Sequence, residues 1–199
     1  MSSHLIRRIK KQLFTSILKG RAQRMADLIV PHLKPGDKVL DVGCGDLKVG
    51  EVVSQKTNVK WVGVDTLEYH QSDLEFHNFD GKKLPFEKAQ FDVVLVAFVF
   101  HHCDDCKPLL SECVRVSRSR IVLFEDVLSG TSFNRFITRF HDKLVNRIID
   151  KRIYCPCTFK TQEEWFDAFR IHDFRNTFAK SLKTHAAALI DQKILVFEC

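Results

Sequence analysis

Val39-Leu40-Asp41-Val42-Gly43-Cys44-Gly45 is the most informative segment for predicting the fold of this chain of 199 residues. Its first four residues are mostly apolar, as in a short buried strand, and two glycines follow them. The next apolar residues recur at helical spacing: Leu47, Val49, Val52 and Val53. A strand, a glycine-rich turn and a helix in this order predict the first unit of a parallel sheet.

The same alternation continues through most of the chain. Further strands are predicted at Trp61–Val64, Leu74–Phe79, Asp92–Ala97, Ile121–Phe124, around Thr177–Leu182 and at Lys193–Glu198. A helix is predicted near residues 105–117 with Asp105 as its N-cap, and Thr161-Gln162-Glu163-Glu164 has the pattern of a capping box. Strands that alternate with crossover helices predict an α/β fold with a parallel sheet.

The N-terminal part of the chain is strongly basic. The formal net charge is +6, and the first 24 residues contain no acid and these cations: Arg7, Arg8, Lys10, Lys11, Lys19, Arg21 and Arg24. Such a segment is either a solvated helix face or a surface that attracts nucleic acid or an anionic membrane. Its apolar stretch is too short to cross a bilayer and no export signal is visible, so we expect no transmembrane segment.

The cysteines favour a reducing compartment. Their number is seven, an odd count, which together with the lack of an export signal predicts a cytoplasmic protein with free thiols. Cys103-x-x-Cys106 and Cys155-Pro156-Cys157 could supply four zinc ligands, but their spacing is not that of a zinc finger. We therefore expect no bound metal.

Asp65, together with the glycine turn, indicates a ligand-binding site. It ends the second predicted strand, twenty residues after Gly45, and a carboxylate at that place can accept both hydroxyls of a ribose. A dinucleotide-binding dehydrogenase is the competing interpretation. Its third fingerprint glycine would stand at position 48, where this chain has Lys48, so the pattern argues against that class.

Together with later segments, this arrangement resembles the class I S-adenosylmethionine-dependent methyltransferases, specifically those of methyltransferase type 11. The later segments are Phe79-Asp80-Gly81-Lys82-Lys83-Leu84-Pro85-Phe86, Phe91-Asp92-Val93-Val94, Phe100-His101-His102 and Ser111-Glu112-Cys113-Val114-Arg115-Val116. The resemblance implies a Rossmann-like, doubly wound sheet of seven mostly parallel strands, with helices on both faces and the last strand antiparallel. We expect one domain over residues 1–199, with N-terminal helices in 1–33, a cofactor-binding core in 37–126 and a substrate-covering helical segment in 131–170.

Carried over residue by residue, the resemblance implies a site for S-adenosyl-L-methionine. Asp41, Gly43, Cys44 and Gly45 would shape the site for the methionine part and the nearby ribose. Asp65, with Thr66 beside it, would hold the ribose hydroxyls. Asp80 and Gly81 would lie at the adenine, and Ala97 and Phe98 close to the sulfonium.

Two features depart from the family pattern. Leu47 stands where many members have a third glycine, and it either packs under the loop or alters the cofactor site. Ser117-Arg118-Ser119-Arg120 replaces the usual Pro-Gly turn before the fifth strand. We expect the second change to have only local effects.

The residues that contact the acceptor are harder to predict from the sequence, because methyl transfer depends mainly on alignment and on excluding water. The predicted catalytic residues are His101, His141 and Asp142, with Glu125 and Asp126 as further candidates for contact with the acceptor. A small-molecule acceptor is the preferred hypothesis. The alternatives are an RNA methyltransferase that uses the basic N-terminal helix, and a non-catalytic cofactor-binding partner protein.

Overall fold

The computed structural model describes residues 20–68, 70–128, 136, 140, 156–182 and 191–199. Within these residues seven strands form one sheet in the order β3-β2-β1-β4-β5-β7-β6. The strands are β1 (Lys38–Val42), β2 (Lys60–Asp65), β3 (Glu75–Asn78), β4 (Phe91–Ala97), β5 (Ser117–Val127), β6 (Arg175–Leu182) and β7 (Asp191–Glu198). β1 to β5 pair in parallel, and β7 is antiparallel to both β5 and β6. The predicted fold class and the antiparallel last strand are confirmed.

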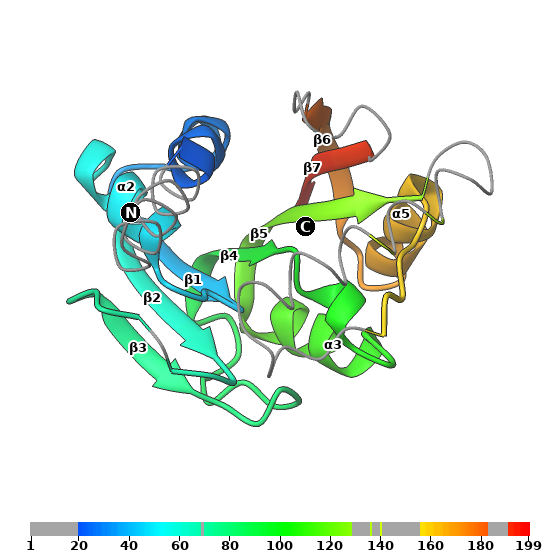
Figure 1. Ribbon diagram of the computed structural model, residues 1–199, viewed down its shortest axis with the longest axis horizontal. Coiled ribbons are helices and arrows are strands. Elements are labelled where there is room, and N and C mark those ends of the chain that lie inside the picture. The colour runs from blue at the N-terminus through cyan, green and yellow to red at the C-terminus, as the bar shows by residue number, and fades with distance from the viewer. Residues whose placement is uncertain (1–19, 69, 129–135, 137–139, 141–155, 183–190) are drawn as a thin grey trace, which may run out of the picture.

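Helices cover both faces of this sheet (Figure 1). Residues 20–29 are helical, and the other helices are η1 (Val30–His32), α2 (Lys48–Lys56), η2 (Phe100–His102), α3 (Lys107–Val116) and α5 (Gln162–Arg170). Two cores result. One packs α3 and α5 against the sheet through residues such as Leu110 and Trp165, and the other packs residues 20–29 and α2 through residues such as Ile29 and Val53. Because both faces are covered, the central strands are almost continuously apolar.

Local capping chemistry is predicted correctly for α5 and wrongly for α3. Thr161 accepts the Glu164 N–H through its hydroxyl, and the Glu164 carboxylate accepts the Thr161 N–H, which completes the capping box. At α3 the N-cap is Cys106, so the prediction of Asp105 is wrong by one position. Asp105 instead accepts the Lys107 N–H at 3.0 Å, since its backbone lies one residue outside the helix.

The carboxyl ends of the central strands lie level with one another. Val42 pairs with Val64 of β2 and with Val96 of β4, and Ala97 pairs with Phe124 of β5. The chain order reverses at β1, because β2 and β3 lie on one side of it and β4 and β5 on the other. Ligands of open α/β sheets bind at the carboxyl edge at such a reversal.

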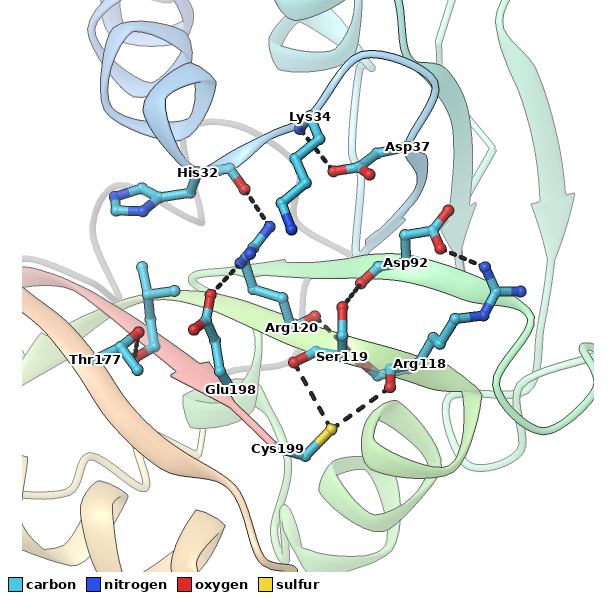
Figure 2. A network of polar contacts seen from close by, with 12 residues as sticks. His32, Lys34, Asp37, Asp92, Arg118, Ser119, Arg120, Thr177, Glu198 and Cys199 are labelled. Carbon is cyan, nitrogen blue, oxygen red and sulfur yellow. Dashed lines mark hydrogen bonds and ion pairs between the residues drawn. The ribbon is translucent and has the colours of Figure 1, made fainter.

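The opposite, amino edge carries the network that replaces the Pro-Gly turn (Figure 2). Arg118 forms an ion pair with Asp92 of β4, and the Ser119 hydroxyl donates to the Asp92 carbonyl at 3.1 Å. Asp92 also accepts the Lys38 N–H of β1 at 2.9 Å. These contacts join the starts of three adjacent strands.

Arg120 extends the network to η1 and to the C-terminal strand β7. Its Nε donates to Glu198 at 2.6 Å, and its guanidinium also donates to the His32 carbonyl at 2.7 Å. The Cys199 N–H donates to the Ser119 carbonyl at 3.3 Å. The expectation of a merely local change is therefore wrong, since basic side chains in this segment reach β4, η1 and β7.

In the predicted substrate-covering segment, most residues before α5 lie outside the described residues, and His141 and Asp142 are among them. Phe136 and Phe140 are described, and both are helical. Their rings stack with centroids 6.4 Å apart, and their side chains are 65% and 61% exposed. In the described part of the chain no helix is long and apolar enough to cross a membrane.

Candidate active site

The glycine loop after β1 closes onto β2 through its backbone. The N–H groups of Gly43 and Cys44 both donate to the Val64 carbonyl, at 2.8 and 3.2 Å. Gly43 has φ +69°, and a Cβ built there would lie 2.3 Å from Cγ2 of Val99. Only a glycine lets the loop turn left-handed and approach the segment after β4 this closely.

Asp65 joins the two loops that follow β1 and β2. One carboxylate oxygen accepts the Gly45 N–H at 2.8 Å, and the other accepts the Leu67 N–H at 3.1 Å. The Asp65 carbonyl accepts the Phe79 N–H at 3.1 Å, which links the loop after β3 as well. The sequence-predicted residues of three separate segments therefore lie together at this edge.

Leu47 is fully buried beneath the loop. It has a left-handed backbone, with φ 59°, directly before α2. Its Cδ2 lies 2.5 Å from a Cβ built at Gly63 of β2, so the side chain packs against the sheet in the space that the glycine leaves. Of the two expectations for Leu47, the structure has the one in which it packs under the loop.

Asp80 and Gly81 lie at the same edge, in the loop that follows β3 next to β2. One Asp80 oxygen accepts the N–H groups of Lys82 and Lys83, at 2.8 and 2.9 Å. These bonds, first that of Lys83 and then that of Lys82, hold the pKa of the Asp80 carboxyl below its usual value. A Cβ built at Gly81 would lie 3.2 Å from Cγ2 of Thr66, so the loops after β2 and β3 are in contact.

Ala97 ends β4, and Phe98 follows it with φ 59°. The Phe98 N–H donates to the Phe124 carbonyl of β5 at 2.8 Å, which fixes this strained backbone. The Phe98 ring lies under the Arg21 guanidinium, 4.6 Å from ring centroid to Cζ. Strained residues held in this way cluster at functional sites.

Burial and the charge of Asp65 shift the pKa values of two neighbouring groups, Asp41 and Cys44. Asp41 is buried, and burial together with the charge of Asp65 raises the pKa of its carboxyl to about 8. Burial, followed by the charges of Asp41 and Asp65, also raises the pKa of the Cys44 thiol well above its usual value. Cys44 therefore stays protonated and acts as a packing residue of the loop.

His101 is buried at the start of the segment after β4. Its Nδ1 lies 2.5 Å from Glu125 of β5, and the other Glu125 oxygen accepts the Phe100 N–H at 2.9 Å. The His101 ring stacks on Phe159 at 4.8 Å, and its carbonyl accepts the Thr158 N–H at 3.2 Å. These contacts join β4, β5 and the segment before α5. A catalytic role for His101 stays a prediction.

The remaining candidates are Asp126 and the cysteines that were considered as metal ligands. Asp126 is buried and accepts a bond from the Gln192 amide at 2.8 Å, so its position is that of a strand-to-strand contact. Burial raises the pKa of the Cys103 thiol to about 11. Among the described residues, no three His, Cys, Asp or Glu side chains are grouped as metal ligands.

Sequence reasoning missed two residues at this edge, Val99 and Arg21. Val99 closes on Gly43, and Arg21 lies on Phe98 from a helix that precedes the motif. Neither has a spacing signal, because both contacts join segments far apart in the chain. The positive charge of Arg21 was visible only as one of many in the basic N-terminal segment.

Comparison with known proteins points to one family. Residues 40–124 match the model of a methyltransferase domain. The demethylmenaquinone methyltransferase of Thermotoga maritima is 32% identical over 113 residues, which cover 52% of this chain and 48% of that protein. The demethylmenaquinone methyltransferase of Bacillus cereus is 29% identical over 117 residues, which cover 51% of this chain and 48% of that protein. The chain thus spans about half the length of the curated relatives it matches.

A solved structure supports the same fold. The 1,6-didemethyltoxoflavin-N1-methyltransferase of Burkholderia thailandensis, crystallised with 1,6-didemethyltoxoflavin and S-adenosylhomocysteine, superposes with a TM-score of 0.67. The alignment covers 100% of this chain and 90% of that chain at 16% identity. At such low identity the likeness concerns the fold alone.

Proposed function

We infer the activity from the family: the chain belongs to the class I S-adenosylmethionine-dependent methyltransferases, and we propose that it methylates a small-molecule acceptor. The observation that carries the proposal is the bond from the Gly45 N–H to the Asp65 carboxylate. It brings the glycine loop and Asp65, the acid that we propose binds the ribose, to one point at the strand-order reversal. From there the proposed site continues to Asp80, which follows β3, and to Phe98, which follows β4.

The charges at the edge suit a cationic cofactor better than a dinucleotide. Asp46 accepts the Lys48 N–H at 3.2 Å, so an acid already occupies the N-terminus of α2, where a pyrophosphate would bind. Asp65 at the end of β2 adds a second carboxylate beside the glycine loop. A sulfonium and an ammonium group are favoured there, whereas a pyrophosphate is repelled.

The residues of the site fit the parts of S-adenosylmethionine. Asp65 would accept the ribose hydroxyls, and Asp80 would accept the adenine amino group through the oxygen that its turn leaves to one side. The cofactor supplies a methyl group already activated by the sulfonium. The protein therefore has to hold the acceptor in line and exclude water, and a base is needed only for an acceptor with a weakly acidic proton.

A small-molecule acceptor is supported by two observations. The relatives are named as methyltransferases of demethylmenaquinone, and the solved neighbour as a methyltransferase of 1,6-didemethyltoxoflavin. The exposed, stacked pair of Phe136 and Phe140 offers aromatic surface in the segment predicted to cover the acceptor. A screen of small molecules and RNA for acceptor-dependent formation of S-adenosylhomocysteine tests this part. Turnover of RNA alone would favour the RNA methyltransferase.

Titration calorimetry tests the cofactor. We expect binding of S-adenosylmethionine and S-adenosylhomocysteine and no binding of NAD, because the acids at the glycine loop favour a cationic ligand. A protein that binds NAD alone would contradict the assignment. Cofactor binding without turnover on any acceptor would favour the non-catalytic partner protein.

The replacement Asp65→Ala is expected to weaken S-adenosylhomocysteine binding by about 1–3 kcal/mol, the cost of leaving polar groups without a charged acceptor. Asp65→Asn is the matched control, since its amide oxygen still accepts one of the two backbone N–H groups. Dissociation constants and thermal unfolding should be measured for both. An unchanged dissociation constant in Asp65→Ala would remove Asp65 from the site.

A further inference from the structure

Helix α3 holds the backbone of the loop that carries Asp80. Glu112 and Arg115 form an ion pair on α3, with 2.7 Å between Arg115 Nε and one Glu112 oxygen. The other Glu112 oxygen accepts the Leu84 N–H at 2.9 Å. Arg115 donates to the Leu84 carbonyl at 3.1 Å and to the Phe86 carbonyl at 2.8 Å. The pair therefore binds backbone groups on both sides of Leu84.

These bonds continue directly into the Asp80 turn. The Asp80 carboxylate accepts the N–H groups of Lys82 and Lys83. The next N–H along the chain, that of Leu84, is bound by Glu112. Three consecutive N–H groups are thus fixed by two carboxylates, one from the loop and one from α3. Because hydrogen bonds to a carboxylate have preferred directions, the attachment to α3 also determines where the Asp80 carboxylate lies.

Apolar contacts attach the same loop to the sheet. The Leu84 side chain is buried in the core on the α3 side. The Phe86 ring makes edge-to-face contacts with His77 of β3 and Phe91 of β4, at centroid distances of 5.1 and 4.9 Å. Such packing has little directionality. The ion pair adds hydrogen bonds of fixed direction to the backbone that follows Asp80.

The ion pair is suited to hold this backbone accurately. The side chains of Arg115 and Glu112 are only 31% and 18% exposed. Their mutual hydrogen bonds hold the pKa of the Glu112 carboxyl below its usual value and raise the pKa of Arg115, so both groups stay charged at neutral pH. Hydrogen bonds of charged groups are short and strong. A binding residue on a loop keeps its geometry only when more rigid elements support it.

We propose that Glu112 and Arg115 are positioning residues that orient Asp80 toward the adenine amino group of the cofactor and so set the preference of the site for adenine. The inference rests on the proposed function, in which Asp80 accepts that amino group. Neither residue of the pair touches the ligand. Selectivity depends on the position of the carboxylate, because a displaced one neither binds an amino group nor repels the carbonyl that replaces it in hypoxanthine.

Two ligands that differ only in the base distinguish this role from general stabilisation. S-adenosylhomocysteine has an amino group at position 6 of its purine, and S-inosylhomocysteine has a carbonyl oxygen there. The wild type should bind the adenine ligand more tightly, because the Asp80 carboxylate accepts the amino group and repels the carbonyl. In Arg115→Met, which keeps an apolar stem and loses the donors, the ratio of the two dissociation constants should fall about tenfold, the effect of losing a charged hydrogen bond. Titration calorimetry measures both constants.

A second pair of variants tests whether Arg115 acts through Asp80. In the background of Asp80→Ala, Arg115→Met should not change the ratio further, because the acceptor of the amino group is already absent. Glu112→Gln has nearly the same shape, and its amide oxygen can still accept the Leu84 N–H. It should lower the ratio by less than Arg115→Met does, and it keeps the proposal testable if Arg115→Met does not fold.

Arg118→Met is the matched control. Arg118 donates to the Ala89 carbonyl at 3.2 Å and pairs with Asp92, so it holds the far end of the same loop. Its replacement should lower thermal stability at most and leave the ratio unchanged. An unchanged ratio in Arg115→Met, an equal weakening of both ligands, or a further fall of the ratio in the Asp80→Ala background would overturn the proposal.

The wild type separates this proposal from the proposed function. Equal affinity for the two ligands would show that Asp80 does not read the base, which overturns the inference and leaves cofactor binding intact. Absence of binding of both ligands would contradict the proposed function itself, and the inference with it.

Discussion

Replacing Gly43 with alanine is expected to lower the free energy of unfolding by about 2–5 kcal/mol. An alanine in a left-handed conformation, here φ +69°, costs about 1–2 kcal/mol. The new methyl group would also lie 2.3 Å from Cγ2 of Val99, and the displacement that relieves this overlap costs about 1–3 kcal/mol more. Because the loop moves away from the segment after β4, cofactor affinity should fall as well.

Gly36→Ala is the matched control for this experiment. Gly36 has φ +88°, but a Cβ built there has no neighbour within 4 Å. Its replacement should cost only the conformational part, about 1–2 kcal/mol, and leave cofactor affinity unchanged. Urea denaturation and calorimetry should be run on both variants. An equal loss of stability in the two would mean that the contact between the glycine loop and Val99 is unimportant.

Asp41→Asn is expected to stabilise the protein at neutral pH and to weaken cofactor binding. Burial, with the charge of Asp65, raises the pKa of the Asp41 carboxyl from 3.8 to about 8. Between these two values the native state holds a proton that the unfolded state has lost, so the wild type loses stability as the pH rises. At pH 7 this cost is at most on the order of 4 kcal/mol, by the linkage of about 1.4 kcal/mol per pKa unit.

The sign of this effect makes the test specific. Asparagine does not titrate, so the gain in Asp41→Asn should be absent near pH 4 and grow up to about pH 8. Binding should weaken because the positive charge of a bound cofactor would favour ionisation of the Asp41 carboxyl, a negative charge that asparagine cannot supply; stability and function then conflict at this position. Unfolding curves from pH 4 to 8.5 measure the difference. Parallel pH profiles of the two proteins would refute the raised pKa.

Features carried by neighbouring residues were predictable from the sequence. The strands and helices of the core follow from apolar periodicity, and the α5 capping box from four consecutive residues. The cofactor motif is equally local, since Gly43 and Gly45 follow β1, and Asp65 ends β2. Parallel pairing of adjacent strands then brings these residues to one edge without further information.

Contacts between distant segments were not predictable in this way. His101 follows β4 as expected, but its burial depends on Glu125 of β5 and on Phe159, which only the packed sheet brings to it. The segment from Ser117 to Arg120 looked like a local turn. Its arginines instead connect Asp92, His32 and Glu198, because β4 and β5 begin, and η1 and β7 end, at the same amino edge.

The α/β class and the position of the glycine loop and Asp65 thus follow from the amino-acid sequence, because periodicity and motif spacing act over a few residues. The directions of the Leu47 and Arg21 side chains follow from the packing of the fold. Leu47 turns inward because Gly63 on the neighbouring strand leaves space for it. Arg21 reaches Phe98 because its helix packs antiparallel to the central strands, and such packing depends on apolar surfaces of elements far apart in the chain.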